Sequence, residues 1–358
     1  MRQTRTDVEW DIVIGYGGGL SAAYVAPWWK DIPPAEHKDN ILLYDENVQG
    51  PRGRFGKFSF AGTTRTTPPG EIGKDTFVGC MISDRNAKGL PLDAALQVAT
   101  VEFRLKADGK HWDSARYCSG HEWPSLIVAP DFASLCVRYR ITRPAWGHGS
   151  SDTPWEGMQQ WFLCKDRLLG MLTIRAVQDN TCAGVWGRLR FGMLREIEAG
   201  ESGVFRYGGL LAKIHAHDFA GIETAKSETL FLDPPEQFRS REILLKDEPS
   251  ASRQQPPFSY KAGQQHYFIA EVLPRSSDAA KDVTAIREGS VLGFSSSQNG
   301  KRYVVLHNES ETPAMYPLKL ASGTAEVFAP AGDRKQLSVA AGVLSLTIPA
   351  NWEPAAPS

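Results

Sequence analysis

The stretch MQQWFLCKDRLLGMLTIR, residues 158–175, decides the fold class of this 358-residue chain. Two runs rich in apolar residues meet at the charged turn Lys165-Asp166-Arg167, a pattern typical of a β-hairpin. Just upstream, in FASLCVRYRI (132–141), apolar residues alternate with Arg138 and Arg140, as in a strand with one buried face. No long amphipathic helix pattern follows residue 100. We therefore predict an all-β, mainly antiparallel protein, a large multi-stranded β-sandwich or supersandwich that follows a short helical or loop N-terminal segment.

Further apolar runs extend this pattern along the chain. They predict strands at 58–61, 99–105, 125–129, 187–192, 242–245, 266–273, 302–308, 315–320, 325–328 and 343–348. Proline pairs and Ser/Gln-rich sequence separate two groups of these strands. We expect four segments: a Gly-rich or helical N-terminal segment (1–45), the main β-sandwich (46–232), a connecting segment (233–263), and C-terminal strands (264–353) that complete the sandwich or form a small β domain.

Composition excludes several classes of function. Hydrophobic residues make up 42% and charged residues 23% of the chain, and the net charge is -1, so there is no basic excess for a nucleic-acid backbone. No apolar run approaches the roughly 20 residues of a membrane helix, and no signal-peptide pattern opens the sequence. The five cysteines are odd in number and lack zinc-like spacing. We expect neither nucleic acid, nor membrane, nor a disulfide framework.

Residues 11–24, DIVIGYGGGLSAAY, offer a different interpretation. An apolar run, glycines from Gly15 to Gly19 and a second apolar run ending at Asp45 follow the order of a dinucleotide-binding βαβ unit. The third glycine of that fingerprint falls on Leu20 or Ala22, and a full crossover helix would meet prolines. A flavin- or NAD-dependent oxidoreductase is therefore kept as an alternative function.

The segment YGGLLAKIHAHDF, residues 207–219, carries two histidines two residues apart. On a regular strand Lys213, His215 and His217 share one face, opposite Ala212, Ile214 and Ala216. Such a pair can hold a divalent metal, zinc or calcium, with the ligand set His215, His217 and Asp218. Because no cysteine or second histidine cluster lies nearby, we favour the two histidines as residues that face a sugar or a carboxylate.

The segment KHWDSARYCSGHEWP, residues 110–124, is dense in aromatic and titratable groups. It lacks a clear period and contains Gly and Pro, so we predict an ordered loop, where catalytic groups often lie. His111, Tyr117 and His121 are acid or base candidates there; the alternative is a packed aromatic loop. Upstream, Arg52 and Arg54 lie in a cation-rich strand that suits carboxylated sugars or forms a solvated face.

These strands also resemble a known family. The hairpin at 159–175, the run HYFIAEVLP (266–274) and the run YVVLHN (303–308) resemble the β-sandwich of polysaccharide lyases of the heparinase II/III-like and chondroitin or hyaluronate lyase group. The similarity covers roughly residues 100 to 320. In such enzymes an α/α-toroid precedes the sandwich, and the polysaccharide between them is cleaved by β-elimination, with Tyr and His as acid or base.

The resemblance implies a carbohydrate-active protein that acts by β-elimination on a uronate-containing polysaccharide or oligosaccharide. A non-catalytic carbohydrate-binding or structural sandwich is the alternative, because this chain shows no toroid, which would come from an N-terminal domain or a partner chain. The family suggests a periplasmic or secreted location. The residues expected to act are as follows: catalytic, His121, Tyr117, His215 and Tyr207; substrate-binding, Arg52, Arg54, Arg116, His111, Trp123 and His217; metal-binding, His215, His217 and Asp218.

Overall fold

The computed structural model describes residues 40–45, 50–55, 58–63, 79–84, 98–107, 110–113, 118–143, 151–164, 167–182, 184–191, 196–226, 241–246, 258–274, 282–298, 300–328, 334–350 and 352. It describes side chains mainly from residue 127 onward. All regular elements in these ranges are strands, which confirms the all-β prediction. Consequently these ranges hold no helix that could cross a membrane. The glycine stretch from Gly15 to Gly19 lies outside them.

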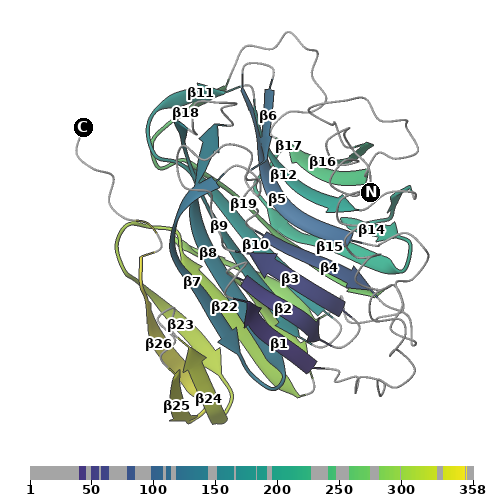
Figure 1. The fold of residues 1–358 in the computed structure, drawn as a ribbon. Helices are drawn as coiled ribbons and strands as arrows, with labels where there is room; N and C mark the ends of the chain where they lie inside the picture. The colour runs from purple at the N-terminus through teal and green to yellow at the C-terminus, as the bar shows by residue number, and fades with distance from the viewer. Residues whose placement is uncertain are drawn as a thin grey trace, which may run out of the picture.

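Two large antiparallel sheets form the body of the molecule (Figure 1). The nine-stranded sheet contains, in order, β1 (Asn40–Asp45), β2 (Gly50–Phe55), β3 (Phe58–Thr63), β4 (Gly79–Asp84), β5 (Val98–Ala107), β12 (Gly184–Phe191), β17 (Arg241–Lys246) and β16 (Gly221–Lys226), with β6 (Lys110–Asp113) paired to β5. The eight-stranded sheet contains β13 (Glu198–Ala199), β14 (Val204–Tyr207), β15 (Leu210–His217), β19 (Gln265–Pro274), β10 (Arg167–Ala176), β9 (Ser151–Cys164), β8 (Phe132–Arg143) and β7 (Cys118–Val128).

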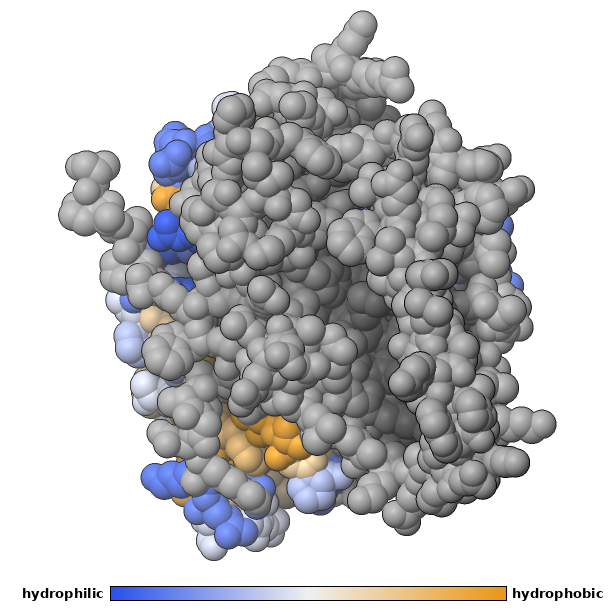
Figure 2. All heavy atoms as spheres, in the orientation of Figure 1, coloured by the Kyte–Doolittle hydropathy of each residue, from blue (hydrophilic) through white to orange (hydrophobic). Residues whose placement is uncertain are grey.

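The remaining strands form smaller sheets. Strands β20 (Val283–Glu288), β21 (Val291–Gln298) and β22 (Lys301–Asn308) make a three-stranded sheet. Three two-stranded pairs are β11 (Asn180–Cys182) with β18 (Phe258–Tyr260), β23 (Ala314–Leu320) with β26 (Gly342–Ile348), and β24 (Gly323–Phe328) with β25 (Arg334–Val339). On the face shown in Figure 2, an apolar area of described residues lies beside hydrophilic ones at the lower left, where Figure 1 places the last two pairs.

The main core fills the space between the two large sheets. Val185 and Leu189 of β12 and Ile243 of β17 belong to the same buried cluster as Val137 of β8 and Leu172 of β10. The predicted hairpin is confirmed, because β9 and β10 pair antiparallel with Arg167 opposite Cys164. Gly170 is needed there, since a Cβ would lie 2.6 Å from the ring of Trp161.

A third layer covers the other face of the eight-stranded sheet. Phe162, Met171 and Ile269 of that sheet pack with Leu292 and Phe294 of β21 in a second buried cluster. All ten residues of β10 are therefore buried, which explains why its sequence is a continuous apolar run instead of an alternating one. Strand β19 lies between β15 and β10, so a segment far along the chain completes the main sheet.

The prediction of a loop at residues 110–124 is wrong for Lys110–Asp113 and for the residues from Cys118 onward, the parts of this segment that the structure describes. Lys110–Asp113 forms β6 and Cys118–Val128 forms β7. The alternating period is absent because β7 shifts register twice against β8, between Ser119 and Glu122 and again between Glu122 and Ser125. Among the described strands β7 is the last of its sheet and pairs only with β8, and an edge strand tolerates Gly and Pro.

Candidate functional site

A β-bulge changes the geometry of the His-x-His strand. Ile214 lies opposite Ala270 and Ala216 opposite Ile269, so His215 is an extra residue in β15 with no counterpart in β19. Such a residue reverses the alternation of faces beyond it. Ile214 therefore packs in the main core, whereas Ala216 packs against the second cluster. The prediction that Lys213, His215 and His217 share one face is wrong.

His215 belongs to a buried ionic cluster between the eight-stranded sheet and the third layer. Its Nε2 lies 2.7 Å from Glu271 Oε2, and Arg167 Nε lies 2.7 Å from Glu271 Oε1. Arg167 also donates through Nη1 to Ser296 Oγ of β21. The three charged or titratable side chains are at most 4% exposed. Glu271 thus contacts both Arg167 and His215, and the cluster connects β10, β15 and β19 with the third layer.

The other described candidates on this segment occupy different surroundings. Tyr207 is buried in the main core and stacks on Phe191, with ring centroids 4.9 Å apart. His217 lies opposite Phe268, a residue of the main core. Asp218 accepts a hydrogen bond from the backbone N–H of Tyr267 at 2.9 Å. In the ranges that the structure describes, no three His, Cys, Asp or Glu residues form a group that could hold a metal ion, so His215, His217 and Asp218 are not brought together.

The remaining candidates are described by their backbone or not at all. Arg52 and Arg54 lie in β2 and His111 in β6, both in the nine-stranded sheet. His121 and Trp123 lie in β7 of the eight-stranded sheet. The side chains of these five residues are outside the described part, and Arg116 and Tyr117 are outside it entirely. The strands on either side of Arg116 and Tyr117 belong to different sheets.

The irregular part of β7 lies at one corner of the eight-stranded sheet. Its first register shift contains His121 and its second contains Trp123. The neighbouring strand β8 shifts register against β9 at the same end of the sheet, between Arg140 and Thr142. Bulges concentrate at sheet edges and beside active sites, where they redirect side chains. This corner is therefore a candidate location for a functional site.

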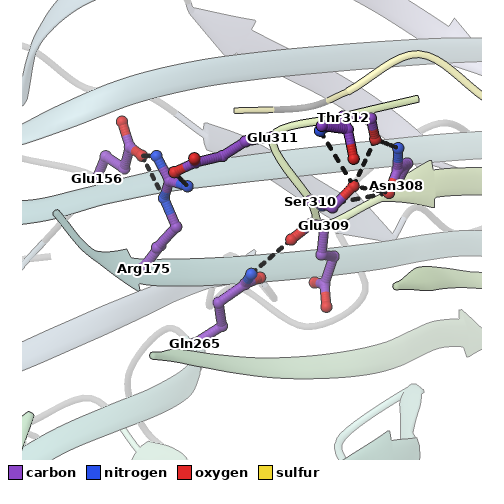
Figure 3. A network of polar contacts seen from close by, with 8 residues as sticks. All are labelled: Glu156, Arg175, Gln265, Asn308, Glu309, Ser310, Glu311 and Thr312. Carbon is purple, nitrogen blue, oxygen red and sulfur yellow. Dashed lines mark hydrogen bonds and ion pairs between the residues drawn. The ribbon is translucent and has the colours of Figure 1, made fainter. Parts of the chain in front are cut away.

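A row of polar residues crosses the sheet at this end. The registers place Arg140 opposite Glu156, Glu156 opposite Arg175 and Arg175 opposite Gln265. Figure 3 shows Arg175 between two carboxylates: its Nε donates to Glu156 Oε1 at 2.7 Å and its Nη1 to Glu311 Oε1 at 2.8 Å. The guanidinium also lies 4.9 Å from the ring centroid of the buried Trp352. Arg175 is thus fixed by both charge and packing.

The turn after β22 joins this row to the third layer. Glu309 accepts a hydrogen bond from Thr173 Oγ1 at 2.7 Å and forms an ion pair with Arg287. Burial raises the pKa of the Glu309 carboxyl, although these two contacts oppose the shift. Asn308, fully buried, donates to the carbonyl oxygens of Thr312 and Ile348 at 2.6 and 3.3 Å (Figure 3 shows the first). This turn is a structural junction between layers.

His307 is a buried histidine at the same junction. Its Nε2 lies 2.9 Å from Gln160 Oε1, which can only accept, so Nε2 carries the proton. Its Nδ1 lies 3.2 Å from Met158 Sδ. Burial lowers the pKa of His307 to about 4. The ring is therefore neutral at physiological pH.

We expect the stability of the protein to fall on acidification through His307. The unfolded chain binds a proton near the ordinary histidine pKa of about 6.5, whereas the folded protein binds it only near pH 4. Between these values the unfolded state gains a proton that the native state lacks, which costs roughly 3 kcal/mol of unfolding free energy. Urea unfolding of wild type and His307→Gln between about pH 7 and pH 4 measures this difference. Equal pH slopes in both proteins would contradict it.

Sequence reasoning did not predict the row that contains Arg140 and Arg175. It also did not predict that Glu156 and Glu311 bind Arg175. Arg138 and Arg140 alternate with buried residues in β8, and in the sequence that pattern predicts a strand and nothing more. The partners of Arg175 are far away in sequence, with Glu311 coming 136 residues later. Only the register of β8, β9 and β10 shows that Arg140, Glu156 and Arg175 are neighbours.

Comparisons with known proteins find similarity only among solved structures. No protein-family model matches the sequence, and no curated protein matches it. Among solved structures, the heparan sulfate lyase HepC from Pedobacter heparinus is similar with a TM-score of 0.34 and 10% sequence identity, over 69% of this chain and 44% of that chain. The matched region thus spans less than half the length of that lyase.

Proposed function

We propose that this chain is a carbohydrate-active protein that cleaves a uronate-containing polysaccharide by β-elimination. The observation that carries the proposal is the irregular corner of β7, where two register shifts contain His121 and Trp123 in an edge strand. A bulged edge gives side chains freedom that a regular, paired strand denies. The hairpin at 159–175 and the runs at 266–274 and 303–308 resemble polysaccharide lyases, and this resemblance supports the same chemistry.

Elimination beside a uronate has three requirements. The charge of the carboxylate must be offset so that the C5 proton becomes acidic, a base must remove that proton, and an acid must protonate the leaving oxygen. We assign the base to His121 and the acid to Tyr117. Arg116 offsets the carboxylate, since a guanidinium fork matches a carboxylate. Trp123 offers an aromatic face for a sugar ring, and Arg52, Arg54 and His111 extend the binding surface.

The proposal gives no catalytic role to the two buried candidates, His215 and Tyr207. His215 is held by Glu271, and Tyr207 is packed in the main core. A general acid or base must come within hydrogen-bond reach of its substrate. We therefore assign the acid and base roles to Tyr117 and His121 instead. A divalent metal remains a separate hypothesis, and metal analysis of the purified protein tests it.

We expect the purified chain to form an unsaturated uronate from heparin, chondroitin, alginate or polygalacturonate, followed by its ultraviolet absorbance. His121→Ala and Tyr117→Phe should each lower the rate by about 100-fold or more, the usual contribution of a positioned acid or base. Lys261→Ala is the matched control, because that side chain is 79% exposed and pairs only at the surface with Asp179.

A flat absorbance trace on all four polymers would overturn the lyase proposal. The second candidate, a non-catalytic carbohydrate-binding sandwich, is favoured by the use of His215 and Tyr207 in buried contacts. That candidate predicts binding to the same polymers without any unsaturated product. Measuring binding and product formation on one preparation separates the two functions.

A further inference from the structure

We propose that Asp218, Tyr267 and Arg287 form a binding site for the hydroxyl groups of a sugar unit, at the rim of the third layer. The proposal rests on the carbohydrate-binding part of the function given above and is independent of the elimination. Asp218 follows β15, Tyr267 lies in β19 and Arg287 lies in β20. None of the three has a role in the elimination proposed above.

Arg287 lies where the buried contact between the layers ends. Val283 and Ala285 of β20 pack against the second buried cluster, and Arg287, two residues farther along the strand, points to the same side. Its side chain is 46% exposed. Tyr267 packs against the same cluster from β19 and is half-buried. The site is therefore open to solvent at a boundary between two layers.

The guanidinium group of Arg287 is held in a fixed orientation. It forms an ion pair through Nη1 with the buried Glu309 and lies 4.9 Å from the ring centroid of Tyr267. Thr173 donates a hydrogen bond to the Glu309 carboxylate at 2.7 Å, and Gln265 donates to the Glu309 carbonyl oxygen at 2.6 Å (Figure 3 shows the second). Among the residues that the structure describes, Glu309 is the only acceptor for this guanidinium, so Nε and Nη2 can donate to a ligand.

Asp218 places an acceptor beside the same tyrosine. Its Oδ1 accepts the backbone N–H of Tyr267 at 2.9 Å and lies 3.5 Å from Nδ1 of His266, and its side chain is 33% exposed. In the described ranges Oδ2 has no donor, and a carboxylate oxygen can only accept. One hydroxyl group of a sugar can therefore donate to Asp218 while another accepts from Arg287.

The charges favour hydroxyl groups over a carboxylate as the ligand. Arg287 already compensates Glu309, and Asp218 adds a second negative charge nearby. Burial is the main cause that raises the pKa of the Glu309 carboxyl, and the charge of Asp218 adds to it. The two carboxylates are thus close enough to interact, and together they would repel a further anion. A neutral ligand that both donates and accepts hydrogen bonds fits this surrounding better.

A purely structural role for Arg287 explains less of the arrangement. An ion pair between a buried carboxylate and a half-exposed arginine gives little net stability, because desolvation of the carboxylate offsets the attraction. Buried titratable groups with a specific charge partner concentrate at functional sites. Side chains that are already held also lose little freedom when a ligand binds. The contacts of Arg287 therefore suit recognition of a ligand.

Affinity electrophoresis of the full chain tests the site. Native gels contain polygalacturonate, its methyl ester or the methyl ester after periodate treatment. Wild type should be retarded by the methyl ester at least as strongly as by polygalacturonate, because the ester keeps the hydroxyl groups and loses the charge. Retardation by the ester should persist at about 0.5 M salt, where interactions between exposed charges are screened. Periodate cleaves pairs of neighbouring hydroxyl groups, so the treated ester should not bind.

Two variants remove one hydrogen-bonding group each. Asp218→Asn keeps an oxygen for the backbone N–H of Tyr267 and loses the charge, and Arg287→Lys keeps a positive charge beside Glu309 and loses the guanidinium fork. Each should bind the methyl ester about tenfold more weakly, the loss of one charge-assisted hydrogen bond. Asp131→Asn is the matched control, because that side chain is also 33% exposed and lies in the turn between β7 and β8, three strands away from β19. The control should change binding less than about twofold, as expected for a distant charge.

The site is wrong if wild type is not retarded by the methyl ester, if periodate-treated ester binds equally well, or if Asp131→Asn loses as much binding as Asp218→Asn. Retardation by polygalacturonate alone, abolished by salt, would show that charge and not hydroxyl groups is recognised. Thermal unfolding of each variant separates lost binding from lost folding, and the variant that melts like wild type decides.

The absorbance assay separates this inference from the elimination. If wild type forms unsaturated product and both variants bind as wild type does, the site alone is wrong. If binding depends on Asp218 and Arg287 and no product forms from any polymer, the site stands and the elimination is wrong.

Discussion

Replacing Glu271 by alanine is expected to destabilise the protein by about 3–5 kcal/mol, the usual cost of removing one partner of a buried ion pair. Glu271 is fully buried and lies within 2.7 Å of both Arg167 and His215. Without it, Arg167 keeps a charge that no solvent reaches, and His215 loses its hydrogen-bond partner. Such a loss is a large fraction of the about 5–15 kcal/mol that holds a typical domain together.

Urea unfolding of wild type, Glu271→Ala and a double variant, Arg167→Met with Glu271→Leu, measures the effect. The double variant removes the charges together and fills the space with apolar atoms, so it should regain most of the lost stability. If Glu271→Ala costs less than about 1 kcal/mol, as an exposed pair would, the cluster is not the buried junction described above. A double variant as unstable as the single one would show that the lost contacts, and not the uncompensated charge, cause the loss.

Replacing Gly293 by alanine is expected to lower the free energy of unfolding by about 3 kcal/mol or more, because there is no space for the added methyl group. A Cβ at Gly293 would lie 2.1 Å from the carbonyl oxygen of Val305, a backbone atom of the paired strand β22. The clash can be relieved only by moving β21 away from β22. That movement would also disturb Leu292 and Phe294, which fill the second buried cluster.

Gly221→Ala is the matched control, since it makes the same substitution in a strand where nothing lies within 4 Å of the added atom. The control should be neutral or stabilising by about 0.5 kcal/mol, because alanine has fewer unfolded conformations than glycine. Thermal unfolding of both variants measures the contrast. Equal melting temperatures for Gly293→Ala and Gly221→Ala would contradict the close approach of β21 and β22.

The sequence predicted most of the strands but not the way in which they meet. The hairpin at 158–175 was predictable because both strands and their turn are adjacent in sequence, and the strand predicted at 242–245 is β17. The bulge at His215 was not visible, because it arises from the register of β15 against β19, fifty residues later. The same cause hid β7, whose two bulges remove the alternation on which strand prediction relies.

The sequence indicated the residue types of the candidate site better than their positions in the fold. The concentration of aromatic and titratable groups around His121 makes this segment a candidate from the sequence alone, although its backbone was expected to be a loop. The arginines of β8 could not be assigned a role, because an arginine that alternates with core residues looks the same whether its face is covered or open. Only the extent of the third layer decides that Arg140 is exposed.

The place of β19 in the main sheet has a consequence for synthesis of the protein. Strands β10 and β15 are both made well before Gln265–Pro274, which pairs with each of them. While the chain is still being translated, their facing edges stay open, and open edges invite pairing with other chains. Contacts between segments so distant in sequence also form slowly. We therefore expect nascent chains of this protein to be most prone to mispairing until β19 has left the ribosome.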